Sequence, residues 1–166
     1  MIIFVIFSAK GGLADMCGGQ SFNWCYMTGI IIVTHGDFAK ALLETAQGIV
    51  GKQQFVFAIT ISYSEDPKSV RQRFEKELYN STNIVNDWLI LTDMVGGTPC
   101  NICFTLVEKF KEKFEVVSGV NLYMIISAFI HREKISLTGL KNKIIEDARA
   151  SVMDAKEKFL KLHAKR

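Results

Sequence analysis

The stretch TGIIIVTHGDF, residues 28–38, decides the fold of this chain. Within it, residues 29–34 form an unbroken, mostly apolar run that lacks the alternation of a half-exposed strand. Such a run is typical of a central parallel strand that is buried on both faces. The next apolar side chains recur at helical spacing and predict the buried face of a helix over 38–50, formed by Phe38, Leu42, Ala46 and Ile49.

The same strand-then-helix pattern repeats toward the C-terminus. Further strands are predicted at 55–61, 88–91 and 115–117, and further helices from 64–67 onward, over 99–111, over 121–130, and as one long helix from Ser136 to Leu162. Four β-then-α units in a row predict an α/β fold with a doubly wound, mostly parallel sheet. Right-handed crossovers then place helices on both faces of that sheet, and the long helix ends the chain.

Residues 1–26 do not continue this pattern. They open with a short apolar run, 1–9, that lacks the positively charged start of a secretory signal, and about eight apolar residues cannot span a bilayer that needs about 20. Glycines, aromatic residues and cysteines follow without a period. We expect residues 1–26 to be a non-native or upstream-start extension and 27–166 to be the functional domain. The alternative is a genuine extension that packs on the domain or on a partner.

The composition is that of a single globular domain. The chain has 166 residues, of which 49% are hydrophobic and 22% charged, a balance that excludes wholesale disorder. A formal net charge of +3 argues against a nucleic-acid-binding protein. The four cysteines, Cys17, Cys25, Cys100 and Cys103, are too few for this length to demand a disulfide framework.

In a doubly wound sheet the ligand site lies at the carboxyl ends of the strands, near the switch in strand order. The segments that follow the predicted strands are 34–37, 62–64, 93–98 and 118–121. The residues that carry chemistry are therefore expected in these four segments.

His35 directly follows the first predicted strand. A neutral imidazole is a nucleophile near pH 7 when the ring is held in one tautomer, and a carboxylate on the other ring nitrogen holds it so. Asp93, at the end of the third strand, is the candidate for that carboxylate. Asp37 is nearer in sequence, but it lies at a helix start, where helix capping is its expected role.

Gly96, Gly97 and Thr98 lie between Asp93 and the next helix. Two glycines allow backbone N–H groups to turn toward an anion, a helix N-terminus favours an anion there, and the threonine offers a hydroxyl. Together with His35, this cradle indicates phosphoryl transfer through phosphohistidine. Taken singly, each feature also has an ordinary structural role, as a satisfied polar residue or as a turn before a helix. The lysine of a Walker phosphate loop is absent, which argues against nucleotide hydrolysis.

Three motifs, in this order, carry a resemblance to a known family: THG at 34–36, TDMVGGTPCN at 92–101 and VSGVNL at 117–122. They resemble the IIA component of the mannose/fructose/sorbose family of the phosphoenolpyruvate-dependent sugar phosphotransferase system. The resemblance implies a flavodoxin-like, cytoplasmic phosphocarrier that is a homodimer and uses no metal or cofactor. It implies a phosphoryl group received from the general histidine phosphocarrier protein and passed to the IIB component, with the membrane reached only through IIC and IID subunits.

The resemblance also assigns roles to residues. His35 matches the phosphorylated histidine and Asp93 the aspartate that orients it, whereas the phosphoryl-binding positions match Thr98, Gly97, Gly96 and Gly36. The chain departs from the family pattern at Val95, where tryptophan is common, and at Leu122, where proline is common. A helical C-terminus in place of the family's exchanged strand leaves the mode of dimerisation open.

Two alternatives remain. Related phosphocarrier domains serve dihydroxyacetone kinase. The Cys-x-x-Cys pair, Cys100 and Cys103, is also the sequence form of a thiol-redox site, because a helix start lowers the pKa of the first thiol. Cys103 falls on the apolar stripe of its helix, which favours simple burial.

Overall fold

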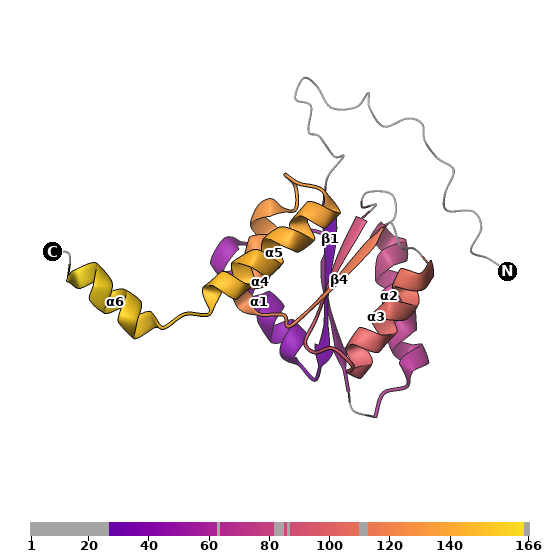
Figure 1. Ribbon diagram of the computed structural model, residues 1–166. Coiled ribbons are helices and arrows are strands. Elements are labelled where there is room, and N and C mark those ends of the chain that lie inside the picture. Colours follow the sequence, from indigo (N-terminus) through magenta and orange to yellow (C-terminus); the bar gives the residue numbers. More distant parts are fainter. Residues whose placement is uncertain (1–26, 63, 82–84, 86, 110–112, 165–166) are drawn as a thin grey trace, which may run out of the picture.

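The computed structural model describes the whole chain except residues 1–26, 63, 82–84, 86, 110–112 and 165–166. The expected extension 1–26 therefore lies outside the described residues. Strands and helices alternate as predicted (Figure 1). The elements are β1 (Thr28–His35), α1 (Phe38–Val50), β2 (Val56–Ile61), α2 (Pro67–Ser81), β3 (Asp87–Thr92), α3 (Thr98–Lys109), β4 (Phe114–Ser118), α4 (Leu122–His131), α5 (Leu137–Ser151) and α6 (Ala155–His163).

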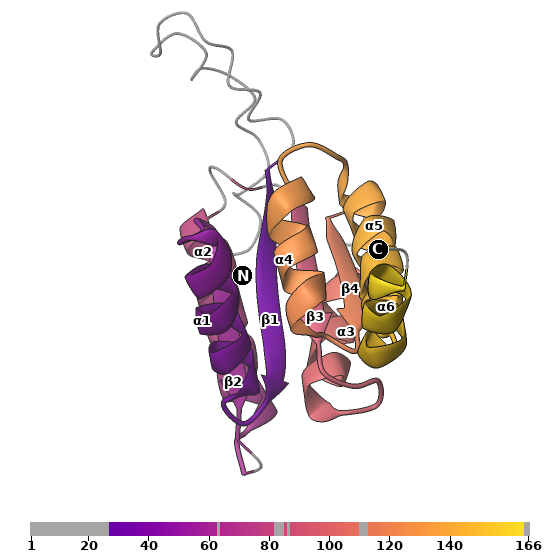
Figure 2. The same ribbon diagram turned by 90° about the vertical axis from the view of Figure 1, so that its left-hand side faces the viewer.

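The four strands form one parallel sheet in the order β2-β1-β3-β4. Helices α1, α4 and α5 cover one face and α2 and α3 cover the other (Figures 1 and 2). The chain winds first to one side of β1 and then to the other, so the order switches between β1 and β3. This is the doubly wound parallel sheet that the strand and helix pattern predicted, and it has the flavodoxin-like architecture that the family resemblance implied.

The absence of alternation in β1 has a direct structural cause. Ile30 and Ile32 point into the core beneath α1, α4 and α5, whereas Ile31 and Val33 point into the core beneath α2 and α3. All four side chains are fully buried. Because the strand is covered on both faces, its polar side chains lie near its two ends, at Thr28 and at Thr34 and His35.

The buried face of α1 differs from the prediction at two positions. Ala39, Leu42 and Ala46 are buried, but Phe38 and Ile49 are 47% and 59% exposed, so their placement on the buried face was wrong. They lie in the first and last turns of the helix, to one side of the line of buried residues that faces the sheet.

The prediction of a single long C-terminal helix was also wrong, because the structure has two helices there, α5 and α6. Ser136 caps α5 as predicted, since its Oγ accepts the N–H of Gly139 at 3.3 Å. Ala148 is the last buried residue of the stripe, and Val152 is 83% exposed with an extended backbone. Asp154 then caps α6 by accepting the N–H of Glu157 at 2.9 Å. The helix breaks where the core ends and a good N-cap residue follows.

Helix α6 extends from the body of the domain and buries none of its own residues (Figure 1). Within the part of the chain that the structure describes, no helix is both long and apolar enough to cross a membrane.

Candidate functional site

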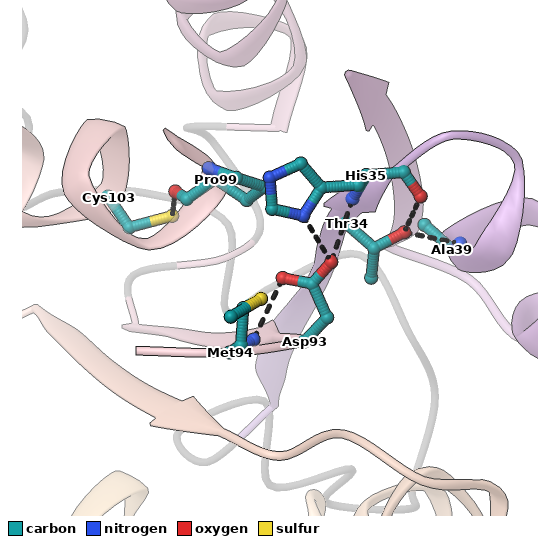
Figure 3. A network of polar contacts seen from close by, with 7 residues as sticks. All are labelled: Thr34, His35, Ala39, Asp93, Met94, Pro99 and Cys103. Atoms are coloured by element: carbon teal, nitrogen blue, oxygen red, sulfur yellow. Dashed lines mark hydrogen bonds and ion pairs between the residues drawn. The ribbon is translucent and has the colours of Figure 1, made fainter. Parts of the chain in front are cut away.

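His35 and Asp93 meet at the carboxyl ends of β1 and β3, at the switch in strand order (Figure 3). Asp93 Oδ2 accepts the backbone N–H of His35 at 2.9 Å and lies 2.8 Å from Nδ1 of the same residue. The other oxygen, Oδ1, accepts the backbone N–H of Met94 at 2.8 Å. The side chains of His35 and Asp93 are 25% and 17% exposed, so the pair is only partly buried.

The surroundings keep Asp93 ionised. Burial alone would raise the pKa of its carboxyl group, but hydrogen bonds from His35 and from the Met94 N–H outweigh burial and hold the pKa below its ordinary range. An ionised carboxylate only accepts hydrogen bonds, which places the proton of the neutral imidazole on Nδ1. The lone pair of that tautomer is on Nε2, on the opposite side of the ring.

The glycine loop lies against the same ring. A Cβ atom at Gly97 would come within 2.8 Å of Cε1 of His35 and 3.2 Å of Cγ of Met94. A side chain at this position would therefore force the His35 ring or the loop to shift. Gly96 has a φ of 82°, a left-handed conformation that favours glycine.

The remaining predicted phosphoryl-binding residues flank this centre. Thr98 is the first residue of α3, so the amino end of that helix lies next to the loop that touches His35. Gly36 turns the chain after His35 with a φ of 54°, and its N–H donates to the carbonyl of Ile61 at 2.9 Å. Their contribution to phosphoryl binding stays a prediction.

Sequence reasoning missed the role of Thr34 at this site and expected Asp37 to cap the helix instead. Asp37 occupies the N-cap position of α1, but its side chain makes no capping hydrogen bond. Thr34, on β1, takes that role because its Oγ1 accepts the N–H of Ala39 at 2.7 Å. The available signal was a hydroxyl residue at the end of an otherwise apolar strand, directly before the candidate nucleophile.

The two cysteines of the redox alternative are inaccessible. Cys100 is 1% exposed, Cys103 is fully buried, and neither forms a disulfide. The Cys103 thiol donates to the carbonyl of Pro99 at 3.0 Å, and burial together with the neighbouring Cys100 raises its pKa to about 12. A thiol that stays protonated is a poor nucleophile, which argues against the thiol-redox alternative.

The described residues also contain no group of three or more histidine, cysteine, aspartate or glutamate side chains placed to hold a metal ion.

Comparisons with known proteins show what the whole chain is similar to. The family model for the PTS system fructose IIA component matches residues 29–145. The fructose-specific EIIA component of Bacillus subtilis is 27% identical over 118 residues, which cover 71% of this chain and 80% of the relative. The mannose-specific EIIAB component of Escherichia coli K12 is 32% identical over 104 residues, 63% of this chain but only 32% of that longer relative.

The fold also matches a solved structure from a third organism. The crystal structure of phosphotransferase system component EIIA from Streptococcus agalactiae aligns with a TM-score of 0.72 at 30% identity. The alignment covers 79% of this chain and 99% of that one.

Proposed function

The chain belongs to the family of PTS system fructose IIA components, and from that membership we propose that His35 is its phosphohistidine. Members of this family are phosphotransferase components of sugar uptake. The observation that carries the proposal is that Asp93 Oδ2 contacts both the backbone N–H and the ring Nδ1 of His35. That contact fixes both the position of the residue and the tautomer of its ring.

In the proposed reaction, Nε2 of His35 attacks the phosphorus of a phosphohistidine on the general histidine phosphocarrier protein. A nitrogen–phosphorus bond forms at His35 while the one in the donor breaks, and the bonding electron pair stays on the donor imidazole. Positive charge develops on the ring of His35 during the attack. The ionised Asp93 stabilises that charge by accepting the hydrogen bond from Nδ1–H, and the proton stays on Nδ1 throughout. In the second step a nucleophile of the IIB component attacks the same phosphorus. The bond from phosphorus to Nε2 breaks, its electron pair returns to Nε2, and His35 is again the neutral, unphosphorylated imidazole.

The loop at 96–98 is proposed to receive the phosphoryl oxygens. It joins Asp93 to the amino end of α3, where unpaired backbone N–H groups and the helix dipole favour negative charge. Such a helix end contributes about 0.3–1 kcal/mol toward an exposed anion. Gly97 lets the loop approach the ring, and the exposed Thr98 hydroxyl is the proposed side-chain donor.

The partners belong to the same proposal. The Escherichia coli relative is described as an EIIAB component, which supports a IIB component as acceptor of the phosphoryl group. A homodimer, a cytoplasmic location and a link to membrane IIC and IID subunits follow from the family resemblance and are proposed with it.

The test is phosphoryl transfer from radiolabelled phosphoenolpyruvate through the general phosphotransferase proteins. The wild-type chain should take up acid-labile label and pass it to IIB, and His35→Ala should take up none. His131→Ala is the matched control. His131 is the last residue of α4, and its Nδ1 contacts the carbonyl oxygen of Ser127 in the same helix at 2.8 Å. Label that persists in His35→Ala would contradict the proposal. Transfer to a dihydroxyacetone kinase subunit rather than to IIB would support the alternative.

A further inference from the structure

Thr34 contacts both sides of the turn that carries His35. It is fully buried near the end of β1. Its Oγ1 accepts the N–H of Ala39 at 2.7 Å and lies 3.3 Å from the carbonyl oxygen of His35, to which the hydroxyl hydrogen is donated (Figure 3). A single hydroxyl thus joins the last strand residues, the turn and the first turn of α1.

This contact replaces an ordinary helix cap. The first N–H groups of a helix have no partner within the helix, and the N-cap side chain normally accepts one of them. Asp37 makes no such bond, and the buried N–H of Ala39 is paired by Thr34 instead. A side chain from β1 therefore caps the start of α1.

We propose that Thr34 is a positioning residue for phosphoryl transfer at His35, an inference that rests on the proposed function. Asp93 holds the N–H and the ring of His35, and Thr34 holds its carbonyl oxygen. The two residues hold the backbone groups on both sides of the His35 Cα atom, and this restricts the positions that the imidazole can take. Small displacements of a reacting group reduce rates by large factors, up to about a hundredfold for 1 Å.

Thr92 provides a matched comparison on the neighbouring strand. It lies opposite Val33 in the sheet, next to the position of Thr34, and is also fully buried. Its Oγ1, however, has no hydrogen-bond partner within the described part of the chain. The same replacement by valine therefore removes two hydrogen bonds at position 34 and none at position 92.

The experiment compares Thr34→Val, Thr34→Ser and Thr92→Val in steady-state transfer from the phosphorylated general phosphocarrier protein, at a temperature where every variant is folded. We expect Thr34→Val to lower kcat by about tenfold or more with little change in KM, since the docking surface is untouched. Thr34→Ser keeps the hydroxyl and should retain kcat within about twofold, as should Thr92→Val. The ¹⁵N chemical shifts of the His35 ring, measured on the unphosphorylated protein, should change only in Thr34→Val.

Each outcome decides the matter. Wild-type kcat and unchanged ring shifts in a less stable Thr34→Val would reduce Thr34 to a structural cap and overturn the inference. An equal loss of kcat in Thr92→Val, or a tenfold loss in a folded Thr34→Ser, would overturn it as well, and the serine variant gives this answer even where Thr34→Val does not fold. Failure of the wild-type protein to become labelled would instead contradict the proposed function.

Discussion

One oxygen of Asp93 holds two groups of His35: Oδ2 lies 2.9 Å from its backbone nitrogen and 2.8 Å from its ring nitrogen Nδ1. The other oxygen accepts the N–H of Met94, so every oxygen of the carboxylate faces a donor. The two residues lie 58 positions apart in sequence and come from strands that pair directly. The arrangement orients a histidine near solvent without burying a charge deeply.

The first prediction concerns the charge of that carboxylate. Asp93→Asn places an N–H₂ group where an oxygen now accepts hydrogen bonds, and a donor then faces a donor. We expect phosphoryl transfer to His35 to slow by on the order of a hundredfold or more, because the tautomer is no longer enforced. Stability should fall by about 1–3 kcal/mol, since a partly buried N–H loses its acceptor. Rapid-quench transfer and urea unfolding measure the two effects.

Asp37→Asn is the matched control for this change. Asp37 is exposed, lies two residues from His35 and makes no capping hydrogen bond through its side chain. Its transfer rate and stability should stay near wild type. Equal loss of transfer in both variants would show that general charge near the histidine matters, and not the specific contact with Asp93.

The second prediction concerns the space beside the ring. Gly97→Ala adds a Cβ atom 2.8 Å from Cε1 of His35, closer than van der Waals contact permits, so the ring or the loop must move. Transfer should fall by about tenfold to a hundredfold. Gly48→Ala, in α1, is the control because its Cβ would meet nothing within 4 Å. That variant should be more stable by about 0.5–1 kcal/mol and transfer normally. Unchanged transfer in Gly97→Ala would show that the loop can move away from the His35 ring without slowing the reaction.

The third prediction is a pH dependence of stability. The folded structure lowers the pKa of Asp93, so the ionised form stabilises the fold at pH values above the unfolded pKa of about 3.9. This contribution is lost as the pH falls through the lower, folded pKa. The difference in unfolding free energy between wild type and Asp93→Asn should therefore be present at pH 5 and shrink below about pH 4. Urea titrations at a series of pH values measure it, and a difference that grows on acidification would contradict the assignment.

The fourth prediction separates the phosphocarrier from the thiol-redox alternative. Cys100 and Cys103 are buried, and the raised pKa of Cys103 keeps its thiol protonated. In the native protein both should react with an aromatic disulfide reagent on the order of a hundredfold more slowly than in urea. Peptide mapping is needed to distinguish them from Cys17 and Cys25. Rapid reversible formation of a Cys100–Cys103 disulfide, with loss of phosphoryl transfer, would favour the redox reading.

Much of this architecture could be predicted because it depends on local patterns. The unbroken run at 29–34 indicates a strand covered on both faces, and Ile30 to Val33 are buried in that way. His35 and Asp93 could be paired before any contact was known, because neighbouring parallel strands bring their carboxyl ends together.

The features that escaped prediction depend on contacts between elements. The apolar period continues through Val152, but the body it would pack against ends near Ala148, and the helix breaks there. Asp37 has the residue type of a cap, yet Thr34 reaches the N–H of Ala39 from the strand. The closeness of Gly97 to the His35 ring is likewise a contact between segments far apart in the sequence, which spacing alone does not reveal.

The most direct test of the central claim is to locate the phosphoryl group on the phosphorylated protein by ³¹P and ¹⁵N NMR of a histidine-labelled sample. The double contact with Asp93 predicts phosphorylation of His35 at Nε2, with a proton retained on Nδ1. A phosphoryl group on Nδ1 of His35, on His131 or His163, or on any residue other than histidine would contradict the account.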